Sequence, residues 1–510
     1  MAPYFASSEY SIGRGEIPES RVEAPVFVGL IIFCSILLVV IHFLLQNPAV
    51  TLASAVSMLV FSFTVVRVEF GVYFLILAML LSPEISGGLV GKKSHELNVR
   101  YDDVLILTIF FGVMVRLAWE GRAQIWRPNP INIAIVLYYL ICIVSTLRAI
   151  QRNLPYFDVP TSIFVMAKML EFYLIFFLVG NAITDQKQIR RQIALFFGVM
   201  LVVAGYAMYQ VGKVDRVGAP FEQGGTEPNT LGGYLTLVMA IAGGIYTQAP
   251  SLRKRIVYLA LIGAAFLPFL YTLSRASYLA LITAMLLLGF FGKSRFLVAA
   301  VILALIISPF VMPEAVQERV NYTFQKGSGV PIVVKGDETV VQVDKSTYER
   351  IYVWKKAFFN LKVWPFFGGG VAWGTVMDSQ YARVIIETGL LGLAAFLFMQ
   401  FRIIKTAREA SRWSRDWFCR GVALGTFCGT VALIVHSLGT ISFLIVRIME
   451  PFWFLVALCV VIRDNAIQEY LKTKEAARAT SVPPNRPSQT KAFTPVYAPA
   501  VKQKPSHPAA

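Results

Sequence analysis

The stretch LPFLYTLSRASYLALITAMLL, residues 267–287, holds one charged residue, Arg275, between two apolar runs. Of the 510 residues, 56% are hydrophobic and only 15% are charged, and the mean hydropathy is +0.62. This composition differs strongly from that of soluble domains. A helix that crosses a bilayer needs about 20 mainly apolar residues, and such runs recur from Val26 to Val460. The sequence therefore predicts an all-α polytopic membrane protein.

We expect twelve to fourteen transmembrane helices, because the apolar run 70–81 is short for a full crossing. The other expected spans are 26–45, 49–66, 103–119, 131–149, 161–180, 193–212, 230–248, 255–272, 277–292, 295–311, 381–401, 418–437 and 440–462. The chain then divides into an N-tail (1–25), eleven spans (26–311), a folded external loop (312–380), three spans (381–462) and a disordered C-tail (463–510).

Basic residues of short loops predict the orientation, since Lys and Arg collect on the cytoplasmic face. With the N-terminus inside, clusters such as 253–255 and 402–420 are cytoplasmic, and Arg216, Arg275 and the loop 312–380 are external. The net charge of +17 follows from this topology and from contact with anionic lipid. The sequence has no groove-reading motif, so we expect no nucleic-acid partner.

Two arginines lie in constrained outer-face turns. Arg216 belongs to the loop GKVDRVGAPFEQGGTEPNTLGGYL, and Arg275 to the turn LSRAS, where Ser277 is the expected helix cap. A guanidinium fixed at the lipid boundary suits a phosphate or diphosphate, because its planar donors pair bidentately with phosphate oxygens. The alternative is that each arginine only extends to the membrane interface.

The external loop contains two recognisable elements. VPIVVKGDETVVQV alternates about a Gly336-Asp337 turn, which is typical of a β-hairpin. From Ser346 we expect a helix with an apolar face that could lie on the membrane surface. The residues of that face are Ile351, Trp354, Phe358 and Leu361.

Four motifs in order resemble the bacterial O-antigen ligase and Wzy-type polysaccharide polymerase superfamily. They are RVGAPF with EPNTLGGYL, then SRAS, then WPFFGGGVAWG, then DSQYARVIIETGLLGL, within residues 193–398. The resemblance implies a GT-C-like fold and a metal-independent, inverting glycosyltransferase without a cofactor. The donor would be a glycan on undecaprenyl diphosphate at the outer face of the bacterial inner membrane, with Arg216 and Arg275 engaging the diphosphate.

One departure from the family pattern concerns the general base. The ligase pattern has a His-Asn pair nine and eight residues before the Glu of ETGLLGL, where this sequence has Asp378 and Ser379 before Glu387. Asp378 could replace the imidazole as base, or could cap the next helix. The missing histidine favours an O-antigen or exopolysaccharide polymerase over a ligase acting on lipid A core. Expected partners are the lipid-linked oligosaccharide, the growing glycan, the bilayer, a chain-length regulator and other polysaccharide assembly proteins.

Further substrate-binding candidates lie near Asp378. Tyr381 and Arg383 could contact the acceptor sugar, and Arg350 lies on the helix expected in the external loop. Glu387 is expected to brace the folded loop from the next helix. The triplet 368–370 is glycine, which would allow the backbone to approach lipid or sugar closely or would serve only a flexible turn.

Other polar residues near the outer face have competing explanations. His436 could supply an imidazole, but a single histidine there is more often a hydrogen-bonded interface residue. Asp102 and Asp103 could mimic metal-binding carboxylates, but no third ligand is evident and helix capping is simpler, so we predict no metal site.

Two i,i+3 charge pairs within spans, Lys168 with Glu171 and Arg447 with Glu450, could offset their charges or line a glycan cavity. A transporter or flippase for polysaccharide lipid would also have many spans and buried charges. The sequence lacks the repeats typical of such carriers, and the long folded loop favours an enzyme. A non-catalytic scaffold for polysaccharide assembly is the third alternative.

Overall fold

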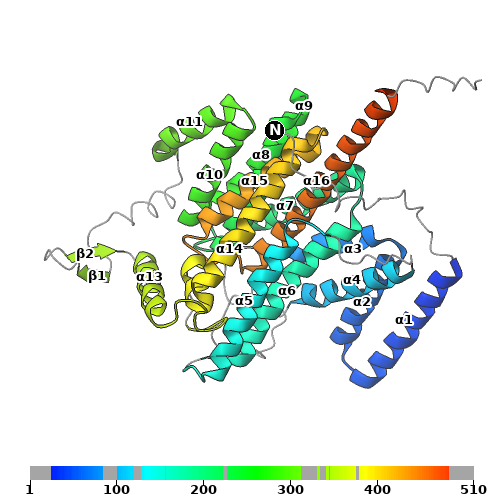
Figure 1. The fold of residues 1–510 in the computed structure, drawn as a ribbon, viewed down its shortest axis with the longest axis horizontal. Helices are drawn as coiled ribbons and strands as arrows, with labels where there is room; N and C mark the ends of the chain where they lie inside the picture. The colour runs from blue at the N-terminus through cyan, green and yellow to red at the C-terminus, as the bar shows by residue number, and fades with distance from the viewer. Residues whose placement is uncertain are drawn as a thin grey trace, which may run out of the picture. The chain divides into compact units, whose positions relative to one another are not determined.

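The computed structural model describes residues 24–83, 100–119, 128–155, 157–221, 227–311, 330–333, 340–343, 345–374 and 378–481. The chain divides into two compact units, Met1–Ala466 and Ile467–Ala510. Helices make up most of the first unit (Figure 1). The elements are α1 (Ala24–Leu45), α2 (Pro48–Val66), α3 (Val68–Leu81), α4 (Tyr101–Trp119), α5 (Asn132–Gln151), α6 (Val159–Ala182), α7 (Gln186–Gln210), α8 (Pro228–Gln248), α9 (Leu252–Leu270), α10 (Arg275–Phe291), α11 (Arg295–Val311), β1 (Val330–Val333), β2 (Val340–Val343), α13 (Lys345–Val363), α14 (Gln380–Trp413), α15 (Trp417–His436) and α16 (Val446–Ser481).

The helices confirm an all-α polytopic membrane protein. Six of them are long and apolar enough to cross a bilayer, and shorter apolar helices include α3 and α10. The six are Asn132–Gln151, Val159–Ala182, Gln186–Gln210, Pro228–Gln248, Gln380–Trp413 and Trp417–His436. A helix lies at the position of every span expected from the sequence.

Two expected boundaries were wrong. The last span begins at Val446 instead of residue 440, and 437–445 is a non-helical connection. The C-tail predicted to be disordered from residue 463 is helical as far as Ser481, because AIQEYLKTKEAARATS is rich in Ala, Glu, Lys and Leu, which favour helix. The rest of that tail and the N-tail 1–23 lie outside the described residues.

Helix α8 is the centre of the helical core and packs against α9, α10 and α15 (Figure 1). Its contact with α15 is made backbone to backbone: a Cβ on Gly244 would lie 2.3 Å from the carbonyl oxygen of Gly421. Small residues of this kind let membrane helices approach closely. The close contact holds His436, the last residue of α15, beside the N-terminal turns of α8, since a Cβ on Gly233 would lie 3.0 Å from the His436 ring.

Helix α14 is kinked at Gly389, which has φ 67° and ψ −162°. The segment 365–370 fits into this kink by four backbone hydrogen bonds: Gly369 to Ile386, Gly370 to Glu387, Leu390 to Pro365 and Leu391 to Phe366. The glycine triplet thus allows a close approach to α14, since a Cβ on Gly368 would lie 2.5 Å from the backbone of Glu387. The Ser145 hydroxyl also bonds the carbonyls of Phe367 and Glu387.

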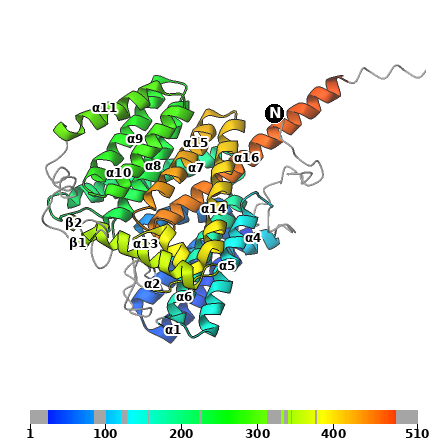
Figure 2. The same ribbon diagram turned by 60° about the vertical axis from the view of Figure 1, so that its left-hand side comes forward.

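The loop 312–380, which we expect to be external, contains both expected elements. Strands β1 and β2 pair antiparallel, with Val330 opposite Val343, and the expected turn lies outside the described residues. Figure 2 shows α13 beside α14. Val353 and Ala357 are buried against α14, and Trp354 and Leu361 of the expected face pack against the same cluster, whereas Phe358 of that face is 60% exposed. Contact of the exposed part of this face with the membrane surface stays a prediction.

We predict that Gly389→Ala lowers the melting temperature of the purified protein. Its φ and ψ lie in a region nearly restricted to glycine, which costs other residues about 1–3 kcal/mol, and a Cβ would lie 2.5 Å from the backbone of Phe366. The matched control is Gly205→Ala in α7, where a Cβ meets nothing within 4 Å. Equal melting temperatures for the two variants would contradict this account of the kink.

Candidate functional site

Arg216 contacts the turn between α9 and α10, directly before Arg275. The Nε of Arg216 donates to the carbonyl of Thr272 at 3.0 Å, and its Nη2 donates to that of Leu273 at 3.3 Å. These two carbonyls belong to the turn after α9, and a cation is favourable near a helix C-terminus. Arg275 follows as the first residue of α10. The loop after α7 therefore brings one guanidinium to the turn that carries the other.

The cap of α10 is Ser274, so the prediction of Ser277 as the cap was wrong. The Ser274 side chain accepts a hydrogen bond from the Ser277 backbone N–H. The helix begins two residues earlier than the expected span because Leu273, with φ 50°, makes the turn that precedes the cap. Arg275 is half-buried in the first turn of α10, where the N-terminal end of the helix also favours an anion.

A continuous chain of hydrogen bonds runs through the buried side of this turn. Ser274 Oγ donates to Asn229 Oδ1 at 2.7 Å, and Ser277 Oγ donates to Ser274 Oγ at 2.8 Å. His436 Nε2 lies 2.9 Å from Ser277 Oγ, and its Nδ1 lies 2.8 Å from Ser442 Oγ. Because the Ser277 proton is directed at Ser274, Nε2 is the donor and Nδ1 accepts from Ser442.

This chain decides between the two explanations of His436. The imidazole is fully buried and both nitrogens have side-chain partners, so His436 is the hydrogen-bonded interface residue that the sequence favoured. It links α8, α10, α15 and the connection 437–445. The sequence did not predict this chain of hydrogen bonds, because its five residues come from three separate segments of the sequence.

The connection 437–445 brings the start of α14 to the same turn. The Gln380 backbone N–H donates to the carbonyls of Ser437 and Thr440 at 3.1 and 3.2 Å. A Cβ on Gly439 would lie 3.2 Å from the Cβ of Ala276, the residue after Arg275. Arg350 of α13 donates from Nη2 to the Gly439 carbonyl at 3.3 Å. Arg216 therefore contacts the α9–α10 turn, and Arg275 begins the helix that follows it. Arg350 contacts the connection 437–445, which packs on that helix.

Asp378 lies two residues before Gln380 and is half-buried. The N-cap position of α14 is Ser379, so the capping explanation of Asp378 was wrong. The short separation from Gln380 keeps Asp378 near the connection 437–445. No described contact assigns it a structural role.

Tyr381 and Arg383 are held by other parts of the protein. The Tyr381 hydroxyl donates to the carbonyl of Ile434 at 2.7 Å. Arg383 Nε donates at 2.8 Å to Glu387 Oε1, which also accepts the backbone N–H of Ala372 at 3.0 Å. Glu387 braces the folded loop as predicted, whereas sugar contacts by Tyr381 and Arg383 stay predictions.

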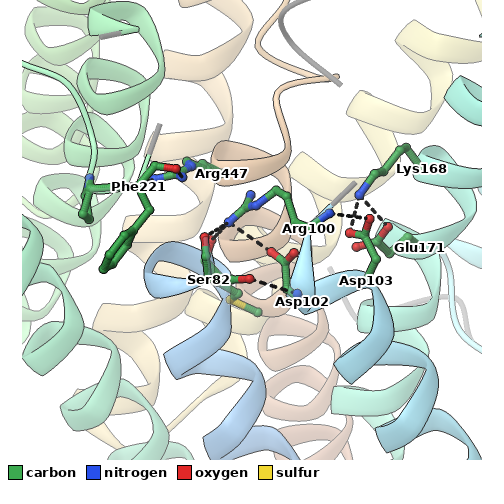
Figure 3. Close-up of polar contacts among 10 residues, drawn as sticks. Ser82, Arg100, Asp102, Asp103, Lys168, Glu171, Phe221 and Arg447 are labelled. Atoms are coloured by element: carbon green, nitrogen blue, oxygen red, sulfur yellow. Dashed lines mark hydrogen bonds and ion pairs between the residues drawn. The ribbon is translucent and has the colours of Figure 1, made fainter. Parts of the chain in front are cut away.

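A second polar cluster lies where α4 begins (Figure 3). Arg100, only 3% exposed, pairs with Asp102 at 3.1 Å and donates to the carbonyls of Met79 and Ser82. Lys168 pairs with Asp103 and, at 3.2 Å, with Glu171. These pairs offset buried charge, as expected for Lys168 and Glu171. Among the described residues, no group of three His, Cys, Asp or Glu is arranged to hold a metal ion.

Arg447 connects α16 to the loop that carries Arg216. Its guanidinium donates to the carbonyls of Pro220 and, at 3.1 Å, Phe221 (Figure 3). Pro220 and Phe221 lie four and five residues after Arg216. The loop is therefore held at two points, by Arg216 on the α9–α10 turn and by Arg447 from α16.

Residues 257–397 match the family model described as O-antigen ligase. This segment is similar to the O-antigen ligase family. It begins within α9, ends within α14, and contains Arg275, Arg350 and Asp378. The resemblance seen in the sequence is confirmed over this segment; Arg216 lies outside it and joins the site through its contacts with Thr272 and Leu273. No curated protein matches the chain.

We predict that Ser277→Ala destabilises the protein by about 1–3 kcal/mol, because it leaves the buried His436 Nε2 without that partner. Thermal unfolding of the purified protein in detergent measures this effect. The control is Thr283→Ala on the same helix, whose hydroxyl donates only to the carbonyl of Leu279 one turn back. If both variants unfold at the wild-type temperature, the hydrogen-bond chain through Ser277 and His436 contributes no measurable stability to the protein.

Proposed function

We propose that this multi-pass membrane protein polymerises a cell-surface polysaccharide, O-antigen or exopolysaccharide, by inverting transfer of glycan from undecaprenyl diphosphate. The observation that supports this proposal most directly is the contact of Arg216 with the carbonyls of Thr272 and Leu273, next to Arg275. It supports a diphosphate site because it brings Arg216 to the turn that precedes Arg275, within the segment that matches the O-antigen ligase family. The proposed location is the bacterial inner membrane, with the site facing the periplasm.

The reaction requires charge stabilisation at the leaving group. The acceptor hydroxyl oxygen attacks the anomeric carbon of the donor sugar from the face opposite the diphosphate. The bond between that carbon and the phosphate oxygen breaks, and the bonding pair leaves with the undecaprenyl diphosphate. Arg216 and Arg275 offset the negative charge that develops on this oxygen, which is the usual way in which an enzyme lowers such a barrier.

The acceptor proton needs a base on the other side of the reacting carbon. We assign it to the carboxylate of Asp378, which is half-buried and lies two residues before Gln380, whose backbone binds the connection 437–445. A carboxylate can serve here because the proton leaves as the new glycosidic bond forms. Arg350 is the proposed contact to the sugar or to the outer phosphate, since α13 holds it at Gly439.

Transfer onto lipid A core is the alternative within the family, and lipid translocation is the alternative outside it. The aspartate where the ligase pattern has histidine favours a polymerase. The packing of α13 on α14 favours an enzyme with a folded external loop over a rocking carrier.

We predict that Arg216→Ala and Arg275→Ala each lower glycan extension by about 100-fold or more, as expected when a donor to developing charge is removed. The assay contains purified protein in lipid, undecaprenyl-diphosphate oligosaccharide and EDTA, and the product length is measured by gel. The control is Arg253→Ala, which removes an exposed arginine from the other end of α9.

Three outcomes would contradict the proposal. Full activity in both arginine variants would leave the diphosphate site unsupported. Loss of wild-type activity in EDTA would contradict metal independence. Movement of the wild-type donor across the bilayer without lengthening would favour the transporter.

We predict that Asp378→Asn lowers the rate constant for transfer by about 100-fold while the Michaelis constant for donor changes little, because the amide keeps the shape but cannot accept the proton. The comparison variant is Asp215→Asn, which neutralises an exposed carboxylate next to Arg216 in sequence. Unchanged turnover in Asp378→Asn would exclude this residue as the base.

A further inference from the structure

A cavity of about 440 Å³ lies between α4, α5, α6 and α16, in a part of the fold that the proposed reaction does not use. Its walls are apolar, with Tyr173, Phe176 and Phe177 of α6 facing Ala457, Val460 and Val461 of α16. The volume is in the range of sites that bind small organic ligands. Val136, Leu140 and Leu170 at its rim are 43%, 51% and 45% exposed, so the mouth faces the surroundings of the bundle.

The polar lining residues gather at one end. They are Asn129 and Asn132 at the start of α5, Asn181 at the end of α6, and Asp464. From Leu170 to Asn181 the cavity follows α6 for roughly 16 Å at about 1.5 Å per residue. Half of a hydrocarbon core of about 30 Å has the same depth. The cavity therefore has the length and polarity of one leaflet, with the polar end at the side where the basic loops lie.

One atom at the polar end points to a ligand. Asn181 is 8% exposed, and its Nδ2 donates to the carbonyl of Phe177 at 2.9 Å. Its Oδ1 is buried without a hydrogen-bond partner among the described residues. A buried carbonyl oxygen without a partner is costly, and a ligand with an N–H or O–H group would satisfy it.

The charges at this end favour a cationic donor. Arg463 is shared by two carboxylates, Glu409 at 2.7 Å and Asp464 at 3.3 Å, so these three groups together carry a negative charge. Arg402 of α14 donates to the carbonyl of Pro130, the residue after the lining residue Asn129, and so brings a cation beside this end of the cavity. The arrangement complements a zwitterion, with an ammonium near Asp464 and Asn181 and a phosphate near Arg402.

We propose that this cavity binds a phospholipid with an ethanolamine headgroup from the cytoplasmic leaflet. Its acyl chain lies along Tyr173 and Phe177, and its ammonium group donates to Asn181 Oδ1 and Asp464. The bound lipid links α5 and α6 to α16, the helix that carries Arg447. The site is separate from the diphosphate site at the other end of the helices.

The test uses full-length protein purified in mild detergent and native mass spectrometry with equal amounts of phosphatidylethanolamine and phosphatidylglycerol. Wild type is expected to retain phosphatidylethanolamine. Val136→Trp, which fills the mouth, is expected to lower the retained fraction about tenfold, equivalent to ~1.4 kcal/mol. The matched control is Leu137→Trp, since Leu137 is also 43% exposed and does not line the cavity.

A second variant tests the headgroup. Asn181→Leu removes the acceptor and is expected to abolish the preference for phosphatidylethanolamine while lipid is still retained. Leu140→Trp replaces Val136→Trp if the latter does not elute as a single folded species. Equal retention in the filling variants and Leu137→Trp would overturn the proposal. It would also be overturned if wild type retained phosphatidylglycerol or a polyprenyl phosphate in preference, or if a second copy of the chain covered the mouth.

Discussion

The contact between Arg216 and the carbonyls of Thr272 and Leu273 is the interaction on which the proposed site depends. Two carbonyls of the turn that follows α9 accept hydrogen bonds, and a planar guanidinium can serve both. The same contact fixes the loop after α7 against the turn that begins α10. The same side chain thus serves backbone hydrogen bonding and carries a positive charge to the turn proposed to bind the diphosphate.

Hydrogen bonds from other parts of the fold fix the position of this turn. The chain from Asn229 through Ser274, Ser277 and His436 to Ser442 connects it to α8, α15 and the connection 437–445. That connection in turn binds the backbone of Gln380 and the side chain of Arg350. The kink at Gly389 and the segment 365–370 fix the first half of α14. Each of these three sets of contacts consists of hydrogen bonds in an apolar surrounding, where such bonds are strong and costly to lose.

Local patterns predicted the membrane class and the hairpin, because hydropathy and turn chemistry are encoded within short segments. The role of the two arginines stays a prediction. These local patterns could not predict contacts between segments that are distant in the sequence. Nothing near His436 in the sequence indicates Ser277, and the burial of Val353 and Ala357 of α13 against α14 is a tertiary contact that the helical pattern does not encode. The helix beyond residue 463 was missed because the tail as a whole is rich in Pro, Ala and Lys and lacks periodicity, whereas its first part has high helix propensity.

The most direct test of the central claim is the affinity of undecaprenyl diphosphate for the purified wild type, Arg216→Ala, Arg275→Ala and the double variant. If both guanidiniums contact one diphosphate, each single change weakens binding about tenfold or more, and the two effects are not additive in the double-mutant cycle. Wild-type affinity in all three variants would show that these arginines serve only the protein's own backbone.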